Sequence, residues 1–100
     1  SKVEKTTNFD GKPICEGDFV SISNNSLKAV STDLAETCIQ TIRTILADRD
    51  CEVITMFKGQ NVSDKVSERI TSFVSDNYMY TEITVVDTDD EFYHVVLSFE

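Results

Sequence analysis

The residues whose types and spacing come nearest to a chemical motif lie between Lys58 and Ser63, where an apolar run gives way to a single glycine. A strand, a glycine and a helix N-terminus in this order can bind phosphate through backbone N–H groups. Phosphate loops, however, usually hold several glycines followed by a lysine, whereas Lys58 here precedes the lone Gly59. The pattern therefore favours a structural turn or a partner-facing loop over a phosphate site.

A second group of candidates is the acidic run that contains Asp87, Asp89, Asp90 and Glu91. Carboxylates are the hard oxygen ligands that Ca²⁺ and Mg²⁺ prefer. The spacing does not match an EF-hand loop, which needs a glycine at its sixth position and a glutamate at its twelfth. We therefore assign no metal site and interpret the run as a solvated acidic turn, which is compatible with a recognition surface.

Reactive side chains are few. No spacing links the single histidine, His94, to a serine and an aspartate as in a catalytic triad. The three cysteines, Cys15, Cys38 and Cys51, form no Cys-x-x-Cys motif, so free thiols in a reducing cytoplasm are the simplest interpretation. A stand-alone hydrolase would depend on His94 or Cys15, and we nominate no catalytic residue.

Length and charge limit the classes of partner. The 100 residues fit one domain, 1–100, in which the polar stretch 1–7 is expected to be a frayed end or a short edge strand. No apolar stretch approaches the roughly 18 residues of a membrane span, and no secretion signal is visible, so we expect a cytoplasmic protein without membrane insertion. The net charge of −9 disfavours nucleic acid and anionic membranes, whereas a basic protein surface would be attracted.

The first half of the chain predicts two strands and a helix. Residues 19–23 and 27–30 are interpreted as a hairpin around an Asn-Asn turn. Asp33, with Glu36 in capping-box spacing, predicts a helix that ends near residues 47–49. Its apolar residues recur at helical spacing and predict the buried stripe: Leu34, Cys38, Ile39, Ile42, Ile45 and Leu46.

The second half predicts a strand, a helix and two further strands. The strand at 51–57 lacks alternation and is expected to be central and covered on both faces or nearly so. Ser63 caps the second helix, and strands follow at 81–86 and 92–99. The order β-β-α-β-α-β-β predicts an α/β (α+β) fold, a mixed sheet with two helices packed on it.

Two expectations about pairing follow from this order. The strands at 51–57 and 81–86 should be parallel, joined by a right-handed crossover, and the last two strands should form an antiparallel hairpin. Because parallel strands end at the same edge of a sheet, the loop at 58–63 and the acidic turn at 87–91 should lie close together, at an edge that often carries sites.

The order and spacing of several segments resemble a known family. These segments are Asn8-Phe-Asp-Gly11, Gly17-Asp18, Val53-Ile-Thr-Met-Phe-Lys-Gly-Gln-Asn-Val-Ser63 and Tyr93-His-Val-Val-Leu-Ser-Phe-Glu100. Over nearly its whole length, the chain is similar to the carboxyl-terminal domain of the catalytic subunit of bacterial fatty acid kinase, which is related to dihydroxyacetone kinase-like proteins. It departs from that family before the last strand, where an acidic run replaces a Gly-Gly-Gln-Pro-like turn.

The resemblance implies a non-catalytic domain of an enzyme of lipid metabolism and phospholipid synthesis. ATP and Mg²⁺ would bind an amino-terminal kinase domain outside this chain, so this domain would hold no cofactor. Its implied partners are a fatty-acid-binding carrier protein, whose acyl carboxyl group is phosphorylated, and the other domains of the same kinase. An alternative is a regulatory domain that senses an acyl or phosphate ligand, which would need a preformed apolar pocket. We predict that the partner contacts Lys58, Gly59, Gln60, Asn61, Asp87, Asp89, Asp90 and Glu91.

Overall fold

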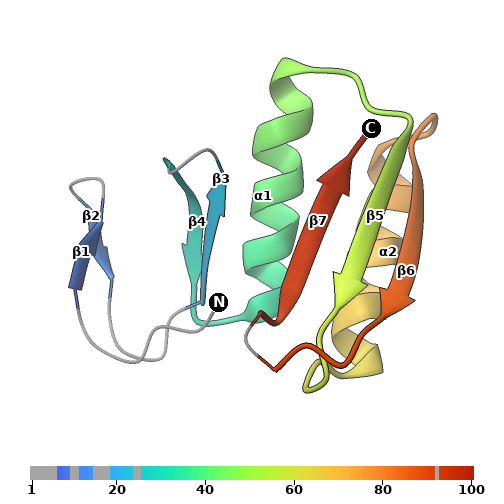
Figure 1. Ribbon diagram of the computed structural model, residues 1–100. Coiled ribbons are helices and arrows are strands. Elements are labelled where there is room, and N and C mark those ends of the chain that lie inside the picture. Colours follow the sequence, from blue (N-terminus) through green and yellow to red (C-terminus); the bar gives the residue numbers. More distant parts are fainter. Residues whose placement is uncertain (1–6, 10–11, 15–18, 24–25, 92) are drawn as a thin grey trace.

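The computed structural model describes residues 7–9, 12–14, 19–23, 26–91 and 93–100 (Figure 1). The elements in chain order are β1 (Thr7–Phe9), β2 (Lys12–Ile14), β3 (Phe19–Ser23), β4 (Ser26–Ser31), α1 (Leu34–Asp48), β5 (Val53–Lys58), α2 (Asp64–Asn77), β6 (Glu82–Asp87) and β7 (Val95–Phe99). The fold is α+β with one mixed sheet and two helices, as predicted.

The first 14 residues differ from the expectation of a frayed end and a turn. Strands β1 and β2 pair as an antiparallel two-stranded sheet, with Thr7 opposite Ile14 and Phe9 opposite Lys12. Residues 1–6, on which most of the expected frayed segment falls, lie outside the described residues. A short β pair therefore precedes the elements that the sequence predicted.

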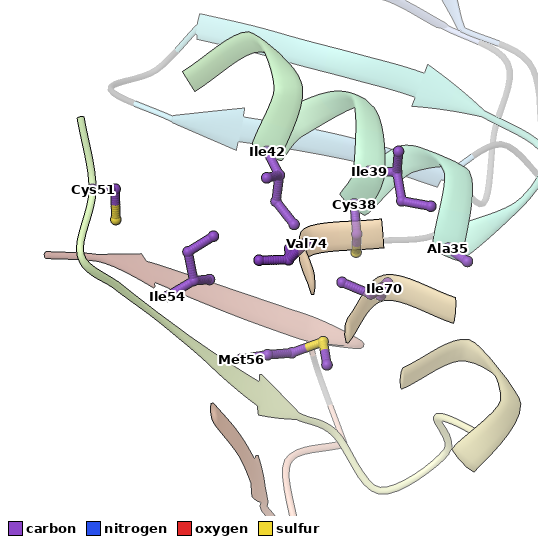
Figure 2. Close-up of a cluster of buried hydrophobic side chains, with 9 residues drawn as sticks. All are labelled: Ala35, Cys38, Ile39, Ile42, Cys51, Ile54, Met56, Ile70 and Val74. Carbon is purple, nitrogen blue, oxygen red and sulfur yellow. The ribbon is translucent and has the colours of Figure 1, made fainter. Parts of the chain in front are cut away.

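The predicted hairpin at 19–30 is confirmed, but it forms a sheet of its own. Strands β3 and β4 are antiparallel and are not hydrogen-bonded to the other described strands. The hairpin packs against α1, so this helix lies between the hairpin and the three-stranded sheet (Figures 1 and 2). Leu27 and Ala29 of β4 are buried.

Both helices begin at the predicted caps. The Asp33 carboxylate accepts a hydrogen bond from the Glu36 N–H at 3.1 Å, and the Ser63 hydroxyl accepts one from the Val66 N–H at 3.4 Å. The Glu36 carboxylate does not complete a capping box, because it accepts hydrogen bonds from Gln40 and Arg69 instead.

Arg69 ties the two helices together. Its guanidinium donates from α2 to Asp33 at 2.9 Å and to Glu36 at 3.1 Å, both at the start of α1. The Glu36 N–H and the Arg69 guanidinium lower the pKa of Asp33, against the opposing effect of burial. The cap of α1 thus also fixes the position of α2.

The three-stranded sheet has the order β6-β5-β7. Strand β5 is central, as predicted, and it is parallel to β6. The predicted hairpin between the last two strands is wrong, because β7 pairs antiparallel to β5, with Phe99 opposite Ile54. The segment at 88–94 must therefore cross the end of β5 before β7 can begin, which takes more residues than the tight turn that we expected.

The hydrophobic core lies between one face of this sheet and the two helices (Figure 2). Its buried members come from α1, β5, α2 and the segment before β5: Ala35, Cys38, Ile39, Ile42, Cys51, Ile54, Met56, Ile70 and Val74. The predicted stripes of both helices supply most of these side chains. Within the described residues, neither helix has the length and apolarity that a membrane crossing requires.

Candidate functional site

The two loops that the sequence placed together are hydrogen-bonded to each other at one end of the sheet. The Lys58 carbonyl accepts a hydrogen bond from the Thr88 N–H at 2.9 Å. The Gly59 N–H donates to the His94 carbonyl at 2.7 Å, and the Gln60 N–H donates to the Asp90 carbonyl at 3.0 Å. The segment at 88–94 therefore runs directly across the end of β5, and the predicted proximity is confirmed.

Gly59 is required by this crossing. A Cβ atom at Gly59 would meet the Tyr93 carbonyl oxygen, and would lie only 2.9 Å from the His94 oxygen and 3.2 Å from the Asp90 oxygen. These are backbone atoms, which cannot move aside as a flexible side chain can. The glycine therefore permits close approach of two chain segments, and its role in the fold needs no phosphate ligand.

Lys58 is buried, and its charge is already neutralised. Its Nζ lies 2.5 Å from the Asp64 Oδ1 and 3.7 Å from the Asp87 Oδ1. The hydrogen bond that Lys58 donates to Asp64 is the main cause that raises the pKa of Lys58, and the same contact lowers the pKa of Asp64. An ammonium group held between two carboxylates is a poor anion ligand, which agrees with the preference for a turn over a phosphate site.

The eight residues predicted to contact a partner divide into two groups. Lys58 and Gly59 are buried and support the loops from below. The exposed or half-buried ones are Gln60, Asn61, Asp87, Asp89, Asp90 and Glu91. Within the described part of the chain, no group of three or more His, Cys, Asp or Glu side chains is placed to hold a metal ion.

Beside these loops, the outer face of the sheet carries an apolar row that the sequence analysis missed. The pairing places Phe57 of β5 between Val86 of β6 and Val96 of β7. These side chains are 37%, 37% and 44% exposed, in that order. No described element covers this face, which is turned to the viewer in Figure 1. We call Val86, Phe57 and Val96 the outer row.

The outer row corrects the expectation that β5 is covered on both faces. Its unbroken apolar sequence suggested two-sided burial, but Phe57 points away from the core formed by Ile54 and Met56. The signal that could have revealed it is the uneven polarity of the outer positions, where Thr55 precedes Phe57. An exposed apolar row bordered by charge is typical of protein-binding surfaces.

The nominees for a hydrolase are not brought together. His94 lies just before β7 rather than within the strand, and its ring meets Phe19 edge-on at 5.3 Å between centroids. Cys38 and Cys51 are free and buried, and burial raises the pKa of Cys38 to about 11. Cys15 lies outside the described residues.

Comparison with known proteins gives the same family as the sequence segments. All of residues 1–100 match the FakA-like C-terminal family, which comprises the C-terminal region of fatty acid kinase proteins. The chain is 25% identical over 96 residues to Protein YloV of Bacillus subtilis (strain 168), covering 96% of this chain and 17% of that protein. It is 23% identical over 96 residues to Uncharacterized protein SH1689 of Staphylococcus haemolyticus (strain JCSC1435), with the same coverage. The chain thus spans about a sixth of the length of these relatives.

Proposed function

Because the chain belongs to the FakA-like family of fatty acid kinase C-terminal domains, we propose that it docks a fatty-acid-carrying protein for the kinase. It acts as a non-catalytic domain of a longer protein, whose ATP and Mg²⁺ sites lie in another domain. Docking raises the effective concentration of the acyl carboxyl group at that kinase domain and fixes its orientation.

The observation that carries this proposal is the outer row beside the acidic loops. Phe57, Val86 and Val96 form an apolar strip across three strands, and Asp87, Asp89 and Glu91 lie at the end of the same strands. Apolar anchors supply affinity when a partner excludes water from them, and the surrounding charges select the partner. We infer that the carrier presents an apolar patch bordered by basic side chains.

Calorimetric titration of this chain with a fatty-acid-loaded carrier protein tests the proposal. We expect binding in the micromolar range, weakened about tenfold or more by Phe57→Ser. Thr84→Ser, on the same face of the sheet but outside the outer row, is the matched control and should bind as the unaltered chain does. Absence of heat at carrier concentrations of roughly 0.5 mM would contradict docking by this domain.

The alternative of an acyl or phosphate sensor finds less support. It needs a preformed apolar pocket, and the described residues instead offer an open groove of about 630 Å³ at the other end of the sheet. Three carboxylates line that groove, those of Asp50, Glu52 and Glu100. They would repel both a fatty-acid carboxylate and a phosphate.

A further inference from the structure

The groove at the end of the sheet opposite the outer row has a second kind of chemistry. It forms where α1 and α2 end, next to the start of β5 and the end of β7 (Figure 1). Its apolar lining comes from Leu46, Cys51, Tyr78, Met79 and Tyr80. It shares none of these residues with the loops or the outer row, so it forms a separate surface.

Two large side chains stand exposed at the mouth of the groove. Met79 is 84% exposed and Tyr80 is 89% exposed, the highest values among the large hydrophobic side chains described. Neighbouring apolar side chains so fully in water are typical of a binding surface, and tyrosine is enriched among the residues that dominate binding energy.

The turn that carries them is held on both sides. The Tyr78 N–H donates to the Val74 carbonyl at 2.9 Å, and the Thr81 N–H donates to the Tyr78 carbonyl at 3.2 Å. The Thr81 hydroxyl donates to the Cys51 carbonyl at 2.6 Å. The backbone around Met79 and Tyr80 is therefore ordered before any partner arrives, which lowers the entropy lost on binding.

The electrostatics of the groove favour a cation. Asp50, Glu52 and Glu100 line it, and the C-termini of both helices end beside it without a basic residue in either last turn. A helix C-terminus carries a partial negative charge. Among the described lining residues the cation is Arg49, whose Nη2 donates to the Phe99 carbonyl at 2.7 Å, and whose guanidinium lies 5.9 Å from the Phe99 ring centroid.

We propose that this groove binds an arginine side chain of a partner protein, with the apolar neighbours of that arginine packed on Met79 and Tyr80. The planar guanidinium can pair with carboxylates and stack on a tyrosine ring at once, which a lysine ammonium group does less well. The inference is independent of the docking role of the outer row, because it uses other residues at the opposite end of the sheet.

Titration of the ¹⁵N-labelled chain with the peptide acetyl-Leu-Arg-Leu-amide tests this, with citrulline in place of arginine as the uncharged isostere. We expect the arginine peptide to shift the amide signals of residues 50–52 and 79–82 and to bind roughly fivefold or more tightly than the citrulline peptide. Equal binding of the two peptides would overturn the proposal. Equally large shifts at 87–91 would also overturn it, because they would indicate general attraction to acidic surface.

Two variants with the same change of charge locate the site. Glu52→Gln should weaken binding of the arginine peptide, whereas Asp89→Asn, at the other end of the sheet, should leave it unchanged. Tyr80→Ser should weaken binding of both peptides, because it removes the apolar surface as well as the ring. An equal loss in Glu52→Gln and Asp89→Asn would place the peptide outside the groove.

Discussion

The ion pair between Lys58 and Asp64 joins the end of β5 to the first turn of α2, and a side chain cannot be buried with its charge unless such a partner exists. Lys58 is buried, whereas the Asp64 side chain is mostly exposed. Asp64 is therefore the member that can be changed with least effect on packing.

We expect Asp64→Asn to destabilise the fold at neutral pH, because Lys58 would lose its nearest carboxylate. The pKa of Asp64 is lowered in the folded chain, so its contribution is present above its unfolded pKa and is lost as the pH falls through the folded value. The stability difference between the variant and the unaltered chain should therefore vanish in acid. Urea unfolding from pH 7 to pH 2.5 measures this, and Glu68→Gln on the same helix is the control. A difference that persists at pH 2.5 would contradict the assignment.

A second prediction concerns the close approach at Gly59. Gly59→Ala should lower the free energy of unfolding by about 2 kcal/mol or more, because the added Cβ meets backbone oxygens of the crossing segment. Gln60→Ala, one residue later and exposed, should change stability by less than about 0.5 kcal/mol. Chemical denaturation of both variants gives the comparison. Equal stability of the two would show that the segments separate at little cost.

At the scale of elements, local signals predicted more than pairing signals did. Asp33 and Ser63 cap the helices as expected, because an N-cap side chain bonds to N–H groups two or three residues away. The pairing of β7 was mispredicted because the strand was expected from residue 92. Starting at Val95 instead, it leaves a connection long enough to cross β5.

The candidate site was predictable to the same extent. The meeting of the loops after β5 and β6 follows from the rule that parallel strands end at one edge, so Lys58 and Thr88 were placed correctly. The outer row was not predictable from one strand alone, because Phe57, Val86 and Val96 become neighbours only through pairing with β5. Only the position of β7 makes the row three strands wide.

The two faces of the three-stranded sheet should respond differently to truncation. Ile54→Ala, in the core between sheet and helices, should cost about 2–5 kcal/mol of stability because it leaves a cavity. Val96→Ala on the outer face should cost less than about 1 kcal/mol. Thermal and urea unfolding measure both. A large loss in Val96→Ala would mean that another segment covers the outer row.

At the scale of the whole molecule, the net charge of −9 should govern how the chain meets a basic partner. Affinity for the carrier should fall severalfold between about 50 mM and 500 mM NaCl, because salt shortens the range of attraction. A chain carrying both Asp89→Asn and Glu91→Gln should show a shallower dependence on salt. Calorimetry at three salt concentrations measures the slope. An affinity that does not change with salt would exclude charge steering while leaving the apolar contact possible.

The position of β7 also shapes how the chain acquires its structure. Phe99 pairs with Ile54 across nearly half of the sequence, and the cost in chain entropy of closing such a loop comes before the contact is made. During synthesis β7 leaves the ribosome after every other described element, so one edge of β5 is unpaired until then. An open strand edge is a template for pairing with other nascent chains. Arrival of β7 closes that edge of β5 and ends the period in which the growing chain is most prone to aggregate.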